Sequence, residues 1–212
     1  MESTAASSIP RPARRRKVPD YLVKEEIDGI KFYYRGYKQV LNKTKSLQDI
    51  MGCSSLQSFL VEYLLTLLIE GGAQKRYRVF TNESGNHLAL RNNLQFDIAL
   101  YDKSLLTADK ITRRYVQAIP PRLVIEVDMD VELEDTGLQN IEEFVLFKTG
   151  KLIEFGARKI IWILSKSKKV VMAEAGKTWT INEWNEELEL LDGIRFNIGK
   201  HLLDEGVNPD AP

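Results

Sequence analysis

Apolar residues between positions 54 and 72 recur at the spacing of an amphipathic helix. These apolar positions are Leu56, Phe59, Leu60, Tyr63, Leu64, Leu67 and Leu68. Either Ser54 or Ser55 can cap the start of the helix, and Gly71-Gly72 can end it. Its polar residues form one narrow ridge at intervals of four: Ser58, Glu62, Thr66 and Glu70. A helix that is apolar nearly all round is expected to pack against a sheet and expose only a thin strip.

Short runs rich in β-branched and aromatic residues predict strands on both sides of this helix. Before the helix we expect a hairpin that turns at Asp28-Gly29 and that residues 37–41 can extend. After the helix, Gly85-Asn86 is typical of a turn. Strands are predicted there at residues 76–80, 94–101, 123–127, 159–164 and 170–173.

A second helical pattern runs from about residue 136 to residue 158, with Gly156 at its end. Lys148 interrupts its otherwise apolar stripe, which consists of Ile141, Val145, Leu152 and Phe155. The order of elements is therefore helix, strands, loop, strand, helix, strand, strand. This order predicts the α/β class, with a mixed β-sheet flanked by helices.

Two carboxylates lie within the predicted strands. Asp97 follows Leu94-Gln95-Phe96, and Glu126 sits inside the apolar run 122–127, where strand alternation places Asp128 on the same face. A carboxylate in such a strand costs several kcal/mol unless a cation pairs with it. Two of them, followed by a lysine on a helix, suggest a metal site that cuts phosphodiester bonds.

Magnesium held by two carboxylates polarises a phosphoryl oxygen and lowers the pKa of a bound water, and a neighbouring lysine can orient that water or neutralise developing charge. The chain has two histidines, His87 and His201, and one cysteine, Cys53, which is too few for a structural zinc site. We therefore expect a hard, oxygen-liganded cation, Mg²⁺ or Mn²⁺. One cysteine cannot form an intramolecular disulfide, which suits a reducing cytoplasm.

The chain has 212 residues, of which 43% are hydrophobic, and this is enough for one full core. We expect a disordered basic arm over residues 1–18, a single domain over 19–207 and a short tail over 208–212. The formal net charge is zero, so any nucleic-acid binding must come from a local patch. Arg14–Lys17 is one such basic cluster, and no apolar run is long enough for a membrane span.

Several motifs, taken in order, resemble the PD-(D/E)XK nuclease superfamily, in particular its Uma-two branch of restriction-endonuclease-like proteins. The resemblance covers most of residues 20–205. The motifs are Glu25–Gly29, Ser54–Gln57, Phe96-Asp97, Pro121–Val127, and the segment from Lys148 through Gly156 to Trp162. The last of these resembles the family's segment of lysine, helix, glycine and strand that ends in tryptophan.

The resemblance implies a restriction-endonuclease-like core and a Mg²⁺-dependent endonuclease whose partner is nucleic acid, with DNA favoured. It makes Asp97 a metal ligand, Glu126 the acidic residue of the second motif and Glu62 a third metal ligand from the first helix. It also implies that the site lysine has moved to the second helix. Lys148 is preferred to Lys151 because its eight-residue spacing to Gly156 matches the family pattern. Such nucleases often dimerise, but the sequence does not decide this.

The chain departs from the superfamily pattern at two positions, since Phe96 replaces the expected proline and Asp128 replaces the archetypal lysine. Both departures, together with the zero net charge, favour a rival interpretation: a catalytically inactive module that binds nucleic acid or a protein partner. A second rival is an enzyme that acts on another phosphate ester or a nucleotide.

Each candidate residue also has a purely structural interpretation. Asp97 can cap a strand or pair with Arg122, and Glu126 can form a buried salt bridge with Lys148. Glu62 can belong to the solvated ridge of its helix, and Glu26 can be an ordinary residue of the hairpin. A salt bridge and a catalytic pair predict the same proximity of Glu126 to Lys148, so proximity alone does not separate them.

Overall fold

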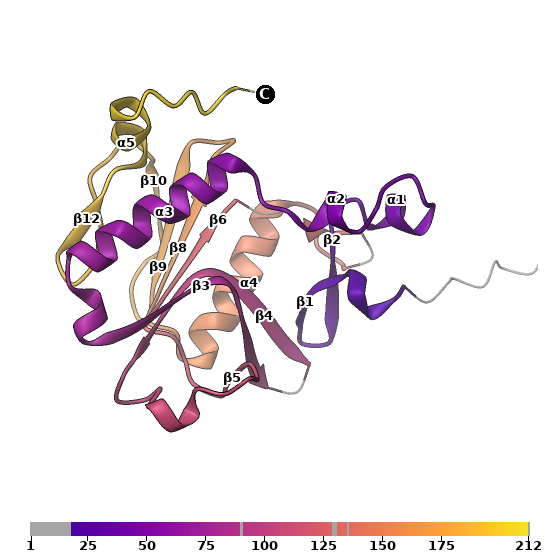
Figure 1. Ribbon diagram of the computed structural model, residues 1–212, viewed down its shortest axis with the longest axis horizontal. Coiled ribbons are helices and arrows are strands. Elements are labelled where there is room, and N and C mark those ends of the chain that lie inside the picture. The colour runs from indigo at the N-terminus through magenta and orange to yellow at the C-terminus, as the bar shows by residue number, and fades with distance from the viewer. Residues whose placement is uncertain (1–17, 90, 129–130, 135, 212) are drawn as a thin grey trace, which may run out of the picture.

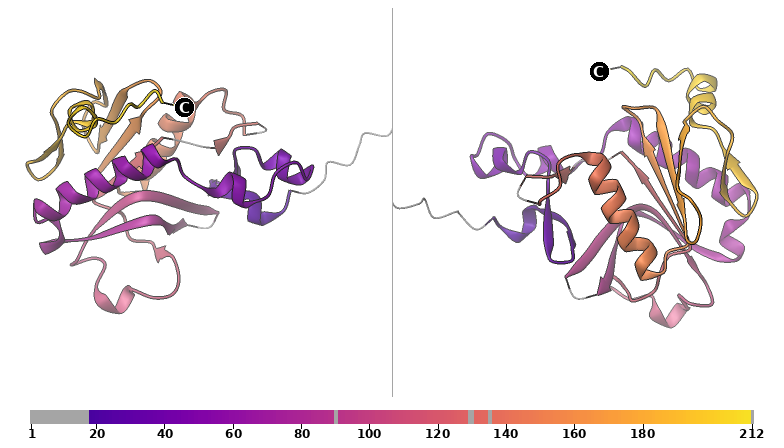
Figure 2. Two further views of the ribbon diagram at one scale, coloured as in Figure 1. Left: turned by 45° about the horizontal axis from the view of Figure 1, so that its top comes forward. Right: turned by 180° about the vertical axis from the view of Figure 1, so that it is seen from behind.

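A computed structural model describes residues 18–89, 91–128, 131–134 and 136–211 of the chain. A large mixed sheet lies between two long helices, α3 (Ser55–Glu70) and α4 (Ile141–Phe155), which cover opposite faces of it (Figure 1; Figure 2). The predicted α/β class, with a mixed sheet flanked by helices, is confirmed. Residues 1–17, to which most of the predicted basic arm belongs, lie outside the described residues.

The order of the main sheet is β10-β9-β8-β6-β4-β1-β2-β7, and β3 lies on the other edge of β4 and also pairs with β5. Its strands are β1 (Val23–Ile27), β2 (Ile30–Tyr34), β3 (Tyr77–Ala89), β4 (Asn92–Asp102), β5 (Val116–Gln117), β6 (Leu123–Val127), β7 (Val131–Glu132), β8 (Lys159–Leu164), β9 (Lys169–Glu174) and β10 (Thr180–Glu183). β6 and β8 are parallel and are joined through α4, because parallel neighbours need a long crossover.

The sheet forks at β4. On the edge of β4 away from β3, residues Ile98–Leu100 pair with β6, and Asn93 pairs with Glu26 of β1. The described pairings leave residues 94–97 without a neighbouring strand on that edge. A forked sheet therefore presents unpaired backbone groups at one interior point, which other groups must satisfy.

Strand alternation divides the apolar residues between the two faces. On one face, Leu60, Leu64 and Leu68 of α3 are buried with Leu123 and Ile125. The other face buries the apolar side of α4 against the remaining strand residues, among them Phe144, Val145, Leu152, Val124 and Trp162. The smaller elements β11 (Leu188–Leu191), β12 (Ile194–Phe196) and α5 (Ile198–Asp204) add to the α3 side.

Two local predictions were wrong. Residues 37–41 form helix α1 (Tyr37–Leu41) and do not extend the hairpin, because Gly36, at φ 86°, redirects the chain after β2. A second short helix, α2 (Gln48–Met51), follows α1. Gly85-Asn86 is not a turn but lies within the long strand β3. The second long helix is also shorter than predicted, since Asn140 caps its start.

Helix α5 was likewise not predicted, although Asn197 caps it and Ile198 and Leu202 are buried one turn apart. None of the helices in the described ranges is both long enough and apolar enough to span a bilayer.

Candidate functional site

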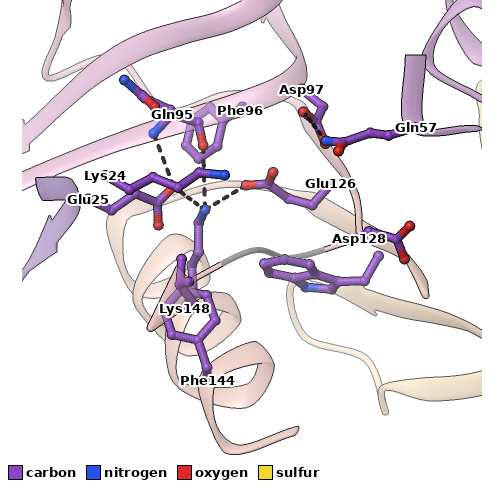
Figure 3. Close-up of a pocket in the computed structure, with 12 residues that line it drawn as sticks. Lys24, Glu25, Gln57, Gln95, Phe96, Asp97, Glu126, Asp128, Phe144 and Lys148 are labelled. Atoms are coloured by element: carbon purple, nitrogen blue, oxygen red, sulfur yellow. Dashed lines mark hydrogen bonds and ion pairs between the residues drawn. The ribbon is translucent and has the colours of Figure 1, made fainter. Parts of the chain in front are cut away.

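Asp97, Glu126 and Lys148 converge on one pocket of about 30 Å³ (Figure 3). They come from three different elements, since Asp97 lies on β4, Glu126 near the end of β6 and Lys148 on α4. Glu126 and Lys148 are buried and Asp97 is half-buried. The structure therefore brings together the two carboxylates and the lysine that the sequence singled out.

The pocket occupies the fork of the sheet, where side chains replace the missing strand. The backbone N–H of Gln95 donates to Glu25 Oε1 at 3.3 Å, and the Gln95 carbonyl accepts from Lys148 Nζ at 3.4 Å. On the other branch, the N–H of Val127 donates to Asp97 Oδ2 at 2.7 Å. The charged groups are thus held in place by the backbone groups that the fork leaves open.

Lys148 lies between two carboxylates. Its Nζ atom is 2.5 Å from Glu25 Oε1 and 2.6 Å from Glu126 Oε1. The rings of Phe96, Phe144 and Trp162 surround the ammonium, with centroids 5.6, 6.0 and 5.6 Å away. In such a dry environment the ammonium is stable only because both carboxylates pair with it. The salt bridge that we considered for Glu126 is therefore present, and Glu25 adds a second.

Burial sets the protonation of these groups. It raises the pKa of Glu126 to about 8, although the Lys148 ammonium acts in the opposite direction. Burial also raises the pKa of Asp97, against the hydrogen bond from the Val127 N–H. Burial alone would lower the pKa of Lys148, but the charges of Glu126 and Glu25 outweigh it and hold that pKa above its ordinary value. Lys148 is therefore a fixed positive charge, whereas the Glu126 carboxyl holds a proton more tightly than an ordinary glutamate does.

Helix α3 brings the side-chain amide of Gln57 into hydrogen-bond contact with the carboxylate of Asp97. Ser54 caps the helix by accepting from the Gln57 N–H at 3.1 Å, and this fixes the first turn. The Gln57 amide then lies 3.1 and 3.2 Å from the two oxygens of Asp97. The predicted alternative of an Asp97 pair with Arg122 was wrong, because Arg122 instead approaches Asp192 at 3.9 Å.

Two of the candidate residues lie outside the pocket. Glu62 is exposed on α3 and does not line it, because five helical positions after Gln57 turn the side chain by about 140° around the axis. The Nζ atom of Lys151 is bound to Asp28 at 2.7 Å and to Glu154 at 3.1 Å.

Asp128 does line the pocket, at a left-handed backbone position (φ 54°) directly after β6. Its oxygens accept from the N–H and the hydroxyl of Ser165 at 2.7 and 2.6 Å. The carboxylate is therefore already tied to the turn after β8.

The donors around the pocket fit a hard divalent cation. Among the described residues, no cluster of three or more His, Cys, Asp or Glu side chains could enclose a metal. Mg²⁺, however, keeps several waters and commonly uses one or two protein carboxylates plus phosphate oxygens. Asp97 and Glu126 supply such a pair, and within the described chain the nearby buried atoms Glu25 Oε2 and Gln95 Oε1 are acceptors without a donor. A hydrated cation would satisfy acceptors of this kind.

Sequence reasoning missed Glu25 and Gln95 and weighed Glu26 in place of Glu25. Strand alternation was the available signal: Glu25 shares a face with the buried Ile27, and Gln95 shares a face with Asp97. Gln57 belonged to a quoted motif, but nothing in the sequence placed its amide on Asp97.

Comparison with known proteins finds similarity among solved structures. No family model matches the chain, and no curated protein matches it. Among solved structures, a crystal structure from Anabaena variabilis, described as a "putative nuclease belonging to DUF820", superposes with a TM-score of 0.56. It is 14% identical to this chain, and the match covers 82% of this chain and 87% of that one. The chain therefore has a nuclease-like fold.

Proposed function

We propose that this protein is a Mg²⁺- or Mn²⁺-dependent nuclease of the PD-(D/E)XK type that hydrolyses phosphodiester bonds in DNA. The observation that carries the proposal is the convergence of Asp97, Glu126 and Lys148 on one pocket at the fork of the sheet. The nuclease-like fold of the Anabaena variabilis protein supports it at the level of architecture.

Each residue has a role that its contacts suit. Asp97 and Glu126 would hold the cation, which when bound polarises a phosphoryl oxygen and makes water a better nucleophile. The Lys148 ammonium would stabilise negative charge that develops on the phosphate. Glu25 contacts Lys148 Nζ at 2.5 Å, so it fixes the ammonium in position. Glu25 is thus a positioning residue, since it acts through Lys148.

The pocket can hold water but not a nucleotide. Its volume of about 30 Å³ has room for two or three water molecules, since one water needs ~10–15 Å³. The reacting phosphate would therefore approach from outside, and the substrate strand would lie across the surface around the opening.

A second candidate function is a non-catalytic module that keeps the same fold. Its support is that the lysine and the aspartate of the pocket already have partners: Lys148 contacts two carboxylates, and the Gln57 amide donates to Asp97. For catalysis, the Gln57 amide must move away from Asp97 so that the cation can bind there. This rearrangement is what an assay of cleavage tests.

The test is cleavage of end-labelled single-stranded and duplex DNA in Mg²⁺, in Mn²⁺ and in EDTA. We expect metal-dependent cleavage by the wild type that falls by about 100-fold or more in Asp97→Asn and Lys148→Met, in line with the loss of one charge-stabilising group. Lys151→Met is the matched control, because Lys151 lies three residues further along the same helix but outside the pocket. Absence of cleavage by the wild type, or cleavage that survives Asp97→Asn, would favour the non-catalytic module.

A further inference from the structure

A larger groove opens beside the catalytic pocket. Its volume is about 310 Å³, and it shares Lys24, Glu25 and Gln95 with that pocket. Pockets that bind small molecules have volumes of ~300–1,000 Å³, so the groove can take a group of nucleobase size where the catalytic pocket cannot. The groove lies along β1 and the start of β4, and Gly85 and Tyr115 form its outer wall.

The ring of Tyr115 packs closely against Gly85 of β3. Because β5 runs parallel to β3 with Val116 opposite Asn86, Tyr115 falls beside Gly85. A Cβ atom on Gly85 would lie only 2.4 Å from the ring carbons Cδ1 and Cε1 of Tyr115, so glycine is required for this approach. The tyrosine is nevertheless 58% exposed. An aromatic ring supported on one side and open on the other is a stacking platform for a base.

Two arginines precede Tyr115 in the chain. Arg113 and Arg114 directly precede Tyr115 and are exposed, and neither side chain has a hydrogen-bond or ion-pair partner in the part of the chain that the structure describes. Exposed arginines that adjoin an aromatic platform in the chain are typical of surfaces that follow a nucleic-acid backbone. They also supply the local positive patch that a chain of zero net charge requires.

The interior of the groove carries more acidic than basic side chains. Three carboxylates line it, those of Asp20, Glu25 and Glu26, against the two ammonium groups of Lys24 and Lys31. Lys31 Nζ is already paired with Asp20 at 2.6 Å. A phosphate would be repelled there, whereas a neutral base can enter and donate its amino or imino hydrogens to the acceptors.

From these contacts we propose that the groove binds an unpaired base of a single-stranded polynucleotide. The base stacks on Tyr115, and the adjoining phosphates lie at Arg113 and Arg114. The strand then passes Lys24, which lines both the groove and the catalytic pocket. A base inside a closed duplex is stacked on both faces and cannot use this platform. The inference deepens the proposed nuclease function by naming its substrate class, and it rests on that function only for what happens after binding.

The test is fluorescence anisotropy in EDTA, with a short fluorescein-labelled oligodeoxythymidylate and with a duplex of the same length. We expect the wild type to bind the single strand at least about tenfold more tightly than the duplex, as loss of one stacked base predicts. Tyr115→Ala should weaken binding of the single strand by about tenfold, which corresponds to ~1.4 kcal/mol. Tyr115→Phe keeps the ring and should stay within about twofold of the wild type.

The arginines have a charge-matched control. Arg113→Ala combined with Arg114→Ala should weaken binding, whereas Lys43→Ala combined with Lys45→Ala should not, because Lys43 and Lys45 lie after α1 and line neither pocket. An oligouridylate of the same length tests whether the groove accepts RNA as well as DNA. Each variant is compared with the wild type by thermal unfolding, so that loss of fold is not mistaken for loss of binding.

Equal affinity for strand and duplex, or unchanged binding by Tyr115→Ala, would overturn the inference. Because EDTA prevents metal-dependent cleavage, this result is independent of the nuclease assay. Asp97→Asn should keep full affinity for the single strand while it loses cleavage. If the groove does not bind the single strand but cleavage persists, only the proposed substrate class is rejected. If the groove binds the single strand but no cleavage occurs, only the proposed nuclease activity is rejected.

Discussion

At the level of single residues, the charges around Lys148 determine how much unfolding free energy is lost when this lysine is replaced. Lys148→Met leaves the Glu25 carboxylate buried without a cation, and breaking a buried ion pair in this way costs ~3–5 kcal/mol of unfolding free energy. Adding Glu25→Gln to Lys148→Met should recover part of that loss, because one uncompensated charge is removed. Urea unfolding of the two variants measures both effects. A loss below ~1 kcal/mol for Lys148→Met would contradict the buried triad.

The raised pKa of Glu126 predicts how stability depends on pH. Its pKa in the folded protein, about 8, lies above the ordinary value of 4.5, so between these values the folded state retains a proton that the unfolded chain has lost. Unfolding free energy should therefore fall as pH rises from about 4.5 to 8. Glu126→Gln removes this contribution, so the variant should gain stability relative to the wild type between pH 5.5 and pH 8.

Thermal unfolding in EDTA at these two pH values checks the prediction. Glu62→Gln, which alters an exposed carboxylate of α3, is the matched control. Parallel pH profiles for Glu126→Gln and the wild type would show that Glu126 is ionised throughout this range in the folded protein.

At the scale of elements, the cap of α4 stabilises the helix that carries Lys148. Asn140 Oδ1 accepts from the Glu143 N–H at 2.9 Å. Asn140→Ala should cost ~1 kcal/mol of unfolding free energy, whereas Asn140→Asp should cost little because aspartate caps equally well. Urea unfolding distinguishes the two variants. Equal losses would mean that packing, and not the cap, fixes the start of α4.

Elements with strong local signals were predicted correctly from the sequence. The α3 helix has its cap and its apolar period within one segment, and β6 and β8 are continuous apolar runs. Gly85 misled the prediction because its role depends on Tyr115, thirty residues later, and not on a turn. The segment of residues 37–41 is too short for a helical period to be recognised.

In the candidate site, too, the residues with a local signal were predictable and those that depend on long-range contacts were not. Asp97, Glu126 and Lys148 were identifiable because each contrasts with an apolar element, and the structure places all three in one pocket. Their partners were not identifiable, since Gln57 lies 40 positions from Asp97 and Glu25 lies 123 positions from Lys148. Contacts at such separations are set by the fork of the sheet, which no local pattern encodes.

At the scale of the whole molecule, zero net charge predicts a weak salt dependence carried by a few residues. Each phosphate contact to a single strand contributes ~0.7 to the slope of log K against log salt concentration. Arg113→Ala combined with Arg114→Ala should therefore reduce the slope by about 1.4. Anisotropy titrations at several salt concentrations measure it. An unchanged slope would place the phosphates elsewhere on the surface.

A cation site formed by Asp97 and Glu126 at the fork of the sheet can be detected by calorimetric titration of Mn²⁺. The titration is made into the wild type, Asp97→Ala and Glu126→Ala, each alone and each with a phosphorothioate oligonucleotide that resists cleavage, because phosphate oxygens can complete the ligand set. We predict binding by the wild type, strengthened by the oligonucleotide, and no binding by either variant although both remain folded. The absence of Mn²⁺ binding by the wild type even with the oligonucleotide, or binding that persists in both variants, would contradict the account.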